Sequence, residues 1–432
     1  MSKLILLQGP IQTRSGYGDH CSDIARAIIK KYPDWELKIL PTVWGGCPIS
    51  EFTDNSEESI LIRSKFMTEN LVRQPDVYIQ ITVPNEFRRM GKYCIGITAG
   101  IETTIADSTW IEGCNRMDLI IVPSKHSKDV FMNTIFDQIN QQKQRVGELK
   151  INKPIEVLFE GIDDKVFKFT DEITPSVEEE MSVVEEKFAF LYVGHWLQGE
   201  HGHDRKDVAG LIKSFYESFA NKTNCPALVL KTSTAGFSVM EQDTIIRKIQ
   251  DIRALVVKEQ KTEKLPNVYL LHGDLTRTDM NSLYNHPKIK AMVSFTKGEG
   301  FGRPLLEFTA SKKPVLVSGW SGQLDFLDNQ TSVLLPGELK QVHQSAVWEH
   351  IIIPESSWFY VDYEFAKSKI RDVFAKYNSY QTKANKQYLT TMNNFTLDKM
   401  ADKMEEIFNK YLQSIPDTLP LNMPQLPKLK KV

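Results

Sequence analysis

Two glutamates stand in and just behind a short glycine-rich loop in the second half of the chain. Glu299 lies within the loop Gly298-Glu299-Gly300-Phe301-Gly302, which follows a predicted strand at 291–295, and Glu307 lies on a helix that Pro304 starts. Glycine lets the backbone turn tightly and bring N–H groups close to a ligand, and a helix N-terminus attracts anions. Two carboxylates would repel a phosphate, but they accept hydrogen bonds from neutral hydroxyls. Together these features predict a site for a nucleotide-sugar.

The spacing of these acids resembles the donor-site signature of one enzyme family. Seven residues separate Glu299 from Glu307, and Lys313-Pro314-Val315-Leu316-Val317-Ser318 follows. This run resembles family-four retaining glycosyltransferases (glycosyltransferase group one), which have the GT-B fold. The resemblance implies that Glu299 orients the sugar through its hydroxyls and that Glu307 binds the nucleoside ribose. The loop residues expected to contact the donor are Gly300, Phe301 and Gly302.

Basic residues near the ends of two further predicted strands are candidates for the phosphates. Arg205 and Lys206 follow the strand at 188–193 and a polar loop, and Lys231 lies at the end of the next strand, 228–232. A charge at the end of a buried strand costs too much to be without a role. Relatives in the resembling family carry a basic residue at the first of these places, where it meets the donor phosphates. The predicted catalytic clamp is Arg205 with Lys231, and the further donor-binding residues expected are Lys206 and Gly273.

The N-terminus begins like an α/β unit. The apolar run 4–7 predicts a buried parallel strand, and a loop with Gly16 and Gly18 leads from it into a helix. This loop lacks the third glycine of a dinucleotide fingerprint, and it resembles the N-terminal glycine loop that faces the donor in GT-B enzymes. Gly16 and Gly18 are therefore expected to bind the donor. On the acceptor side, Arg14 and His20 are candidates to reach the diphosphate or acceptor, with a local hydrogen bond at the helix start as the alternative for His20.

A further glutamate lies on the expected acceptor side. Glu102 follows the predicted strand at 93–97, and Trp110 lies on the helix after it. A glutamate just after a strand end is placed for chemistry, so Glu102 is a catalytic candidate. Trp110 is an acceptor-side candidate, although packing is the favoured role for its side chain. Relatives commonly carry a histidine near the sugar in this region, and this chain has none between His20 and His126.

Length and composition favour a soluble two-domain protein. The chain has 432 residues, more than one ordinary core accommodates. Hydrophobic residues make up 41% and charged residues 25%, and the net charge of −2 gives no global argument for nucleic-acid or membrane binding. Five scattered cysteines without a Cys-x-x-Cys pair suit a reducing compartment. We see no signal peptide and no apolar run of membrane-spanning length, and we expect a cytoplasmic protein.

Apolar runs separated by helix-length segments predict parallel sheets. The expected fold class is α/β, with the GT-B arrangement of two Rossmann-like domains that face each other across a cleft and a C-terminal helix that returns to the first domain. The expected divisions are 1–170 for the acceptor-side domain, 171–187 for an acidic linker, 188–362 for the donor domain, 363–415 for C-terminal helices packing back towards the first domain, and 416–432 for a mobile tail.

Two segments have weaker patterns. Residues 133–153 are polar with scattered basic side chains, which favours a solvated helix face over a basic patch on the acceptor side. Helical spacing dominates 363–412 but is interrupted around 378–396.

The sequence predicts an enzyme without a metal ion or a cofactor beyond its co-substrate. His201 and His203 lie beside acids, but they flank a glycine in a loop and lack the spacing that places metal ligands. In the resembling fold, side-chain cations replace the divalent ion. A phosphorylase-like or epimerase-like enzyme of the same fold is an alternative, since a fold does not fix its chemistry. A catalytically inactive binding module is a third, disfavoured because Glu299, Glu307 and the basic pair are all present.

The acceptor is the least determined part of the sequence. The run at 9–18 resembles glycosyltransferases of tailed bacteriophages, some of which modify hydroxymethylated cytosine in DNA. The predicted acceptor is therefore 5-hydroxymethylcytosine in phage DNA, with the enzyme in the host cytoplasm, and a protein, polysaccharide or lipid acceptor is the alternative. Basic side chains on the acceptor half are the second reason for a DNA partner. They are Arg88, Arg89, Lys92, Lys143, Arg145, Lys150 and Lys153.

Overall fold

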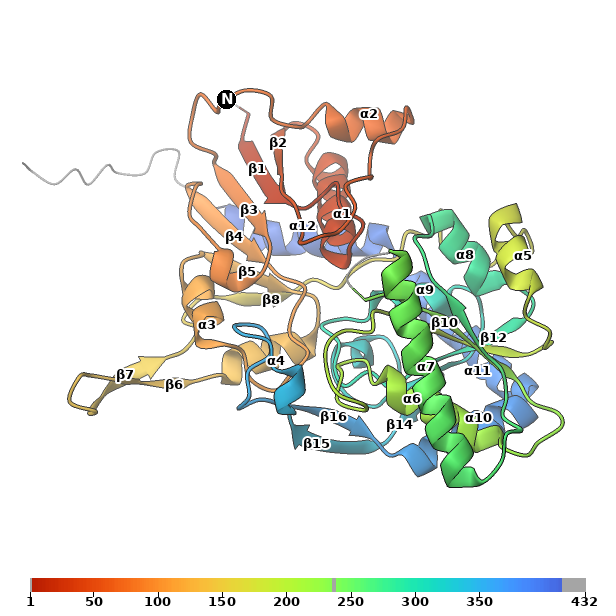
Figure 1. Ribbon diagram of the computed structural model, residues 1–432. Coiled ribbons are helices and arrows are strands. Elements are labelled where there is room, and N and C mark those ends of the chain that lie inside the picture. The colour runs from red at the N-terminus through yellow and green to blue at the C-terminus, as the bar shows by residue number, and fades with distance from the viewer. Residues whose placement is uncertain (1, 235–237, 414–432) are drawn as a thin grey trace, which may run out of the picture.

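The structure, a computed structural model, describes residues 2–234 and 238–413 and contains two α/β domains (Figure 1). Each domain is built on a parallel sheet of six strands. The strand order is β2-β1-β3-β4-β5-β8 in the first sheet and β11-β10-β9-β12-β13-β14 in the second. Every connection between neighbouring parallel strands needs a crossover, and helices supply most of these crossovers. The prediction of two Rossmann-like domains is confirmed.

The first domain carries the N-terminal glycine loop. Its strands and helices are β1 (Leu4–Gly9), α1 (Gly16–Lys31), β2 (Glu36–Pro41), α2 (Glu57–Arg63), β3 (Val77–Ile81), a 3₁₀ turn η1 (Pro84–Glu86), β4 (Tyr93–Ile97), α3 (Ser108–Asn115), β5 (Leu119–Val122), α4 (Lys125–Asn133), β6 (Phe136–Ile139), β7 (Arg145–Leu149) and β8 (Ile155–Val157).

The second domain carries the loop with the two glutamates. Its elements are α5 (Pro175–Ser182), β9 (Ala189–Val193), α6 (Val208–Phe219), β10 (Ala227–Lys231), α7 (Val239–Gln260), β11 (Val268–Leu271), α8 (Arg277–Asn285), β12 (Ile289–Ser294), α9 (Arg303–Thr309), β13 (Val315–Ser318), a 3₁₀ turn η2 (Gly322–Asp325), β14 (Val333–Leu335), β15 (Gly337–Gln341), a 3₁₀ turn η3 (Gln344–Ala346) and β16 (Ser357–Val361).

Three helices complete the chain, and they divide between the domains. They are α10 (Tyr363–Ala375), α11 (Tyr377–Asn394) and α12 (Leu397–Leu412). Helix α10 packs on α6 and α11 packs on α9, so both belong to the second domain. Only α12, among these three, lies beside α1 of the first domain (Figure 1). The predicted return of a C-terminal helix is confirmed, but it begins at Leu397 rather than at 363.

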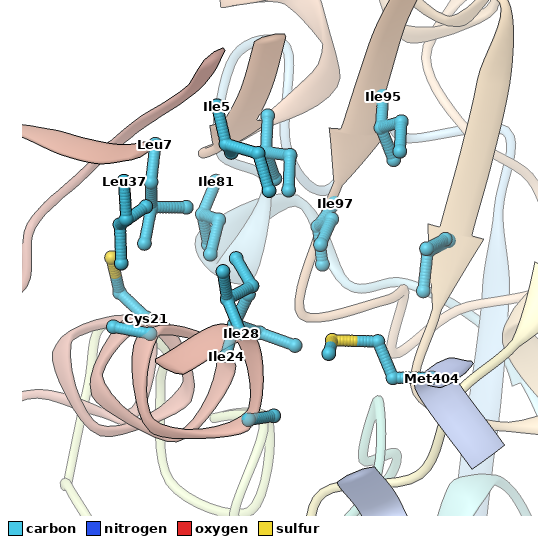
Figure 2. Close-up of a cluster of buried hydrophobic side chains, with 14 of the residues drawn as sticks. Ile5, Leu7, Cys21, Ile24, Ile28, Leu37, Ile81, Ile95, Ile97 and Met404 are labelled. Carbon is cyan, nitrogen blue, oxygen red and sulfur yellow. The ribbon is translucent and has the colours of Figure 1, made fainter. Parts of the chain in front are cut away.

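The apolar face of α12 completes the core of the first domain. Ile24 and Ile28 of α1 point towards Ile5 of the sheet, and Met404 closes the side of the same cluster (Figure 2). All four side chains are almost fully buried. Truncating a buried side chain of this size lowers the free energy of unfolding by about 2–5 kcal/mol. Helix α12 is therefore a structural part of the first domain. Salt bridges from α1 to Asp398 and Asp402 at its edge add little by comparison.

The chain crosses between the domains twice, and the two crossings lie side by side. Ile162 N donates to Phe395 O at 2.7 Å, and Leu397 N donates to Ile162 O at 2.9 Å. Gly161 allows this approach, because a Cβ there would lie 2.8 Å from Leu397 Cα. Paired crossings of this kind are the natural hinge between two domains.

Three sequence predictions need correction or refinement. Residues 133–153 form the end of α4 and the β6–β7 hairpin rather than a helix, with Phe136 opposite Leu149 and Asp137 opposite Glu148. The hairpin projects from the first domain (Figure 1). The acidic linker 171–187 contains α5, whose Val177 and Met181 are buried in the core of the second domain.

Helix α11 also occupies most of the predicted break at 378–396, and the only non-helical residues in that range are Phe395 and Thr396, which separate α11 from α12. Its docked face is polar, which explains why apolar spacing failed to reveal it. Gln387 Nε2 donates to Phe326 O at 2.7 Å, and Thr391 Oγ1 lies 2.8 Å from Thr309 Oγ1. The tail 416–432 lies outside the described residues.

Within the described ranges, no helix combines the length and apolar character that crossing a membrane requires.

Candidate active site

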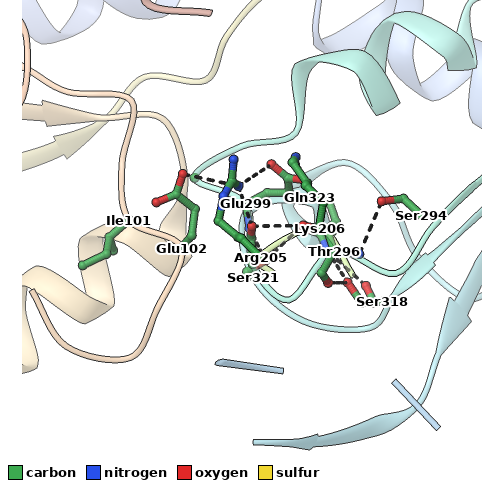
Figure 3. A network of polar contacts seen from close by, with 12 residues as sticks. Ile101, Glu102, Arg205, Lys206, Ser294, Thr296, Glu299, Ser318, Ser321 and Gln323 are labelled. Atoms are coloured by element: carbon green, nitrogen blue, oxygen red, sulfur yellow. Dashed lines mark hydrogen bonds and ion pairs between the residues drawn. The ribbon is translucent and has the colours of Figure 1, made fainter. Parts of the chain in front are cut away.

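Four charged side chains meet where the two domains face each other (Figure 3). Glu102 comes from the loop after β4, and the other three come from loops of the second domain. Arg205 Nη1 lies 3.4 Å from Glu102 Oε1 and 3.5 Å from Glu299 Oε2. Lys206 Nζ donates a hydrogen bond to Glu299 Oε1. Two cations thus lie among two carboxylates beyond the carboxyl ends of the strands, where α/β proteins bind ligands.

Burial and charge compensation set the protonation of this group. Burial opposes ionisation of Glu299, but Lys206 and Arg205 outweigh it and hold the pKa of Glu299 below its ordinary value. Burial lowers the pKa of Lys206, and the charge of Glu299 offsets only part of that effect. An anion that enters this site would compete with the Glu299 carboxylate for both cations.

The backbone of the 298–302 loop is held by neighbouring turns. Glu299 N donates to Ser321 Oγ at 2.9 Å, and Ser321 itself has a φ of 81°, in the left-handed region that is costly for a residue with a Cβ. Gly302 has a φ of 101° and precedes α9, so a glycine is required there. These contacts fix the direction in which the Glu299 side chain leaves the loop.

The glycines of this loop approach the opposite domain. A Cβ at Gly298 would lie 1.9 Å from the carbonyl oxygen of Glu102, and a Cβ at Gly300 would lie 1.9 Å from that of Ala99. Either clash involves backbone, which cannot swing away. The sequence predicted that Gly300 lets the backbone approach a ligand. In this arrangement of the domains, the glycine instead makes room for the loop of the first domain that contains Ala99.

Lys231 lies in the same charged region but has a different partner. Its Nζ donates to the carbonyl oxygen of Gly273 at 2.6 Å. Gly273 has a φ of 128°, and a Cβ there would meet nothing within 4 Å. The glycine is therefore required by its backbone conformation and not by close neighbours. Of the predicted clamp, Arg205 contacts Glu299 together with Lys206, whereas Lys231 bonds a backbone carbonyl of the neighbouring loop.

Sequence reasoning assigned no role to His195, which lies two residues after the end of β9. Burial lowers the pKa of His195, and the charges of Lys206, Arg205 and Lys231 lower it further. All three cations are therefore close to one imidazole. Its Nδ1 lies 3.0 Å from Ser233 Oγ. A glycine-histidine pair at a strand end was the only signal in the sequence.

A buried lysine beneath the basic loop was also missed. Lys297 is fully buried, and its Nζ donates to Asp204 O at 2.9 Å and lies 3.4 Å from Asp207 Oδ1. Its ammonium lies 4.7 Å from the centre of the Tyr360 ring. Lys297 N also donates to Arg205 O, so this residue supports the segment that presents Arg205 and Lys206.

Glu307 lines a small cavity of about 200 Å³ between the domains. Burial raises the pKa of Glu307 to about 7, although Arg303 opposes the shift. Arg14 Nε lies 3.0 Å from Glu51 Oε1, and Arg14 Nη1 pairs with Asp274 across the domain interface. Other residues around the cavity include Gly16, Asp19, Leu275 and Arg277. The structure thus brings the predicted residues Arg14, Gly16 and Glu307 together.

Several predicted contacts are not available to a ligand in this structure. Trp110 is 3% exposed and stacks on Phe131, an arrangement that favours the packing role over contact with an acceptor. Phe301 is buried against Phe326, which leaves only its backbone for a donor. His20 is buried as well, and burial lowers its pKa to about 4. The backbone at Gly18 packs closely on Thr13. A Cβ at Gly18 would lie 2.0 Å from Thr13 O, so this position requires a glycine for packing.

Four of the seven acceptor-side basic residues form an ion pair with a neighbouring acid, and Arg88, Lys143 and Lys153 have none among the described residues. The pairs are Arg89 with Asp118 at 2.8 Å, Lys92 with Asp76 at 2.7 Å, Arg145 with Asp137 at 2.7 Å and Lys150 with Glu148 at 3.0 Å. These pairs reduce the uncompensated charge available to a nucleic-acid backbone.

Neither side of the cleft gathers metal ligands. Over residues 2–234 and 238–413, no group of three or more His, Cys, Asp or Glu side chains is close enough to hold a metal ion. His203 instead stacks on His343 with ring centroids 4.0 Å apart, and its Nδ1 lies 3.2 Å from the Tyr360 hydroxyl.

Comparison with solved structures shows the GT-B fold. A glycosyltransferase from Rickettsia africae matches with a TM-score of 0.61 at 14% identity, over 96% of this chain and 99% of that one. Anabaena HepE, solved in complex with UDP-glucose, matches with a TM-score of 0.57 at 13% identity over 94% and 99% of the two chains. Sucrose-phosphate synthase from Thermosynechococcus elongatus gives 0.58 at 11% identity over 95% and 99%. These similarities cover nearly whole chains.

No protein-family model matches the sequence, and no curated protein is significantly similar to it.

Proposed function

We propose that this protein is a retaining glycosyltransferase that transfers a sugar from a UDP-sugar to an acceptor hydroxyl. The observation that carries the proposal is the placement of Arg205 and Lys206 on Glu299 at the domain interface. A second acid, Glu307, lies beside the adjoining cavity. Solved proteins of the same fold include one in complex with UDP-glucose, which supports the choice of donor.

The donor's parts match the side chains available. The diphosphate pairs with Arg205 and Lys206, with Lys231 nearby, and these cations stabilise the negative charge that develops as the sugar leaves. Glu299, released from the cations, accepts hydrogen bonds from the sugar hydroxyls. Glu307 accepts hydrogen bonds from the ribose. Glu102 faces the same cations from the first domain and orients the acceptor hydroxyl.

The reaction breaks the bond between the anomeric carbon and the diphosphate oxygen, and the electron pair goes to that oxygen. The acceptor oxygen bonds to the anomeric carbon on the same face, and its proton passes to the departing phosphate. Retention of configuration rests on the resemblance of the Glu299–Glu307 spacing to the retaining family. It is tested by the anomeric proton coupling of the product in an NMR spectrum.

For the acceptor, 5-hydroxymethylcytosine in DNA stays the specific prediction that the sequence offers. A base inside a duplex must leave the stack to reach the cleft, which costs a few kcal/mol. Phosphate contacts must offset that cost, and the ion pairs on the acceptor half reduce the charge available for them. A carbohydrate, protein or lipid hydroxyl is the alternative.

The deciding experiment has two stages. First, nucleotide-sugars are screened for slow hydrolysis by the full chain, and we expect a UDP-sugar to be consumed. Next, transfer from that donor is measured to hydroxymethylated and ordinary duplex DNA at low salt, and to glycan, protein and lipid acceptors. Hydrolysis of no nucleotide-sugar, together with no measurable binding of UDP, would overturn the proposal. If the sugar is transferred only to a non-DNA acceptor, the proposed enzyme class stands and that acceptor replaces DNA.

A further inference from the structure

Arg303 joins the two domains through a single buried guanidinium. It is the first residue of α9 in the second domain, and its side chain is 8% exposed. Its Nη1 donates to Asp23 Oδ2 of α1, in the first domain, at 2.7 Å. Its Nε donates to Glu307 Oε1, one helical turn further along α9, at 3.1 Å. One rigid fork therefore holds carboxylates from both domains at once.

The surroundings of Arg303 are strongly acidic. Asp19 Oδ2 lies 3.9 Å from Arg303 Nε, and the charge of Glu160 also acts on the guanidinium. Asp23 accepts a second hydrogen bond from Arg26, on its own helix, at 2.9 Å. Other groups that face the cluster include the neutral His20, the Tyr284 hydroxyl 3.5 Å from Glu307 Oε2, and the more distant Arg277. Two further acids lie at its edge, Glu58 paired with Arg26 and Asp163 paired with Arg277. No other arginine among the described residues pairs with both Asp23 and Glu307.

The cluster adjoins the cavity proposed for the nucleoside. Glu307 and Asp19 both line that cavity, whose volume of about 200 Å³ is below the roughly 300–1,000 Å³ of ordinary ligand pockets. A nucleoside diphosphate must therefore widen the gap between the domains to enter. The domains can move about the paired crossings at Ile162 and Leu397, and Arg303 ties them together at the cavity.

We propose that Arg303 is a positioning residue that couples recognition of the nucleoside by Glu307 to closure of the two domains. The proposal rests on the function proposed above. In the closed form, Asp23 holds the guanidinium so that Glu307 receives one N–H and keeps lone pairs for the ribose hydroxyls. In an open form, Asp23 withdraws and the freed N–H groups can turn to Glu307, where they compete with the ribose. Tight nucleoside binding then requires closure.

The test uses full-length variants and two readouts. The variants are Arg303→Met, Arg303→Lys and Asp23→Asn, with Arg26→Met as the matched control because it removes the other arginine from Asp23 without crossing the domains. The first readout is the radius of gyration of the ligand-free protein by X-ray scattering. The second is calorimetric UDP affinity between pH 6 and pH 8.5, with thermal melting to confirm that each variant is folded.

We expect Arg303→Met and Asp23→Asn to increase the radius of gyration and to weaken UDP binding by about tenfold, the loss of one charge-assisted hydrogen bond. Arg303→Lys should recover part of the affinity, because an ammonium keeps the charge but cannot hold two carboxylates in a fixed fork. Arg303→Met should also move the pH dependence of UDP affinity upwards, because Glu307 loses the cation that favours its ionised form. Arg26→Met should remain within about twofold of the parent for both readouts, because Arg303 still pairs with Asp23 and no bond between the domains is lost.

Two results would overturn the proposal. One is an unchanged radius of gyration in both Arg303→Met and Asp23→Asn. The other is an Asp23→Asn protein that is open but binds UDP as tightly as the parent, since closure and recognition would then be independent. If the parent protein binds no UDP, the proposed function fails instead, and the scattering measurement still decides whether Arg303 holds the domains together.

Discussion

Two ionic clusters span the interface between the domains, and they differ in the ratio of cations to carboxylates. In the cluster of Figure 3, Arg205 and Lys206 face Glu102 and Glu299, so cations and carboxylates are equal in number. In the cluster around Arg303, carboxylates exceed arginines even when Arg26 is counted. The first cluster is balanced in charge, whereas the second has an excess of carboxylates.

The pKa values follow this difference. The pKa of Glu299 is below its ordinary value because two cations outweigh its burial. Burial raises the pKa of Glu307 to about 7 and that of Glu160 to about 8, since one arginine cannot compensate every acid around it. In the balanced cluster, a phosphate can take the place of a carboxylate as the partner of Arg205 and Lys206. An acid-rich cluster instead responds to pH and to hydroxyl donors.

The largest effect should come from breaking the balanced cluster. Lys206→Met leaves Glu299 buried with Arg205 alone and removes a cation from the leaving diphosphate. We expect kcat for UDP-sugar turnover to fall by about 10²–10³-fold, the usual loss when a donor to developing charge is removed. Initial rates with saturating donor measure this.

A matched control for that variant is Lys213→Met, on α6, whose ammonium pairs with Glu259 at 2.8 Å outside the cleft. Its kcat should remain within about twofold of the parent, as expected for an exposed ion pair. Equal loss in both variants would mean that Lys206 acts through general stability and not on the leaving group.

The second effect concerns the predicted clamp. Arg205→Ala and Lys231→Ala should each weaken UDP binding by about 1–3 kcal/mol, the size of a charge-assisted hydrogen bond. Arg205 should show the larger loss, because it also holds Glu102 and Glu299, whereas Lys231 bonds a backbone carbonyl. Calorimetry with UDP measures both. Affinities unchanged in the two variants would remove the clamp from the mechanism.

The acid-rich cluster is the target of the third prediction. Glu307 accepts two hydroxyls well only when ionised, so UDP affinity should rise as pH increases through about 7. Glu307→Gln cannot ionise, and it should bind UDP about tenfold more weakly at pH 8.5 with little pH dependence. A Glu307→Gln protein whose affinity still follows the parent's pH curve would assign the titration to another group.

The sequence predicted those parts of the molecule whose pattern lies within a short stretch of residues, and it missed those held by residues far apart in the chain. Apolar runs predicted the parallel strands because both faces of each sheet are covered, and the Glu299–Glu307 spacing predicted a loop and helix that the structure contains. The partner of Arg303 is Asp23, 280 positions earlier, and no local pattern marks such a pair. Lys297 was missed for the same reason, because its acids lie on another strand's loop. The β6–β7 hairpin was missed because most of its side chains are exposed, and part of α11 was missed because its buried positions include Gln387 and Thr391.

A smaller effect is expected on stability. The folded pKa of Glu160 is raised by burial to about 8, so the folded protein binds this proton more tightly than the unfolded chain does. Its contribution to stability is therefore present at low pH and is lost as pH rises towards 8. Glu160→Gln, which resembles the protonated acid, should gain stability relative to the parent as pH rises from 5.5 to 8.5, by roughly 5 °C in Tm. A difference in Tm that does not change with pH would mean that Glu160 is ionised in the folded protein.

The smallest effect should follow from removing metal ions. Arg205, Lys206 and Lys231 already place positive charge around the expected diphosphate, and after burial their charges are the next largest causes that lower the pKa of His195. A divalent cation beside them would add repulsion unless further carboxylates held it. We therefore predict that UDP-sugar turnover in excess EDTA stays within about twofold of the untreated rate, since fixed side-chain cations can supply the stabilisation that a metal gives elsewhere. Complete loss of turnover in EDTA, restored by magnesium or manganese, would show that the balanced cluster is not sufficient. It would also direct attention to Glu102 and Glu299 as metal ligands, because their carboxylates would then have to leave Arg205 when the donor binds.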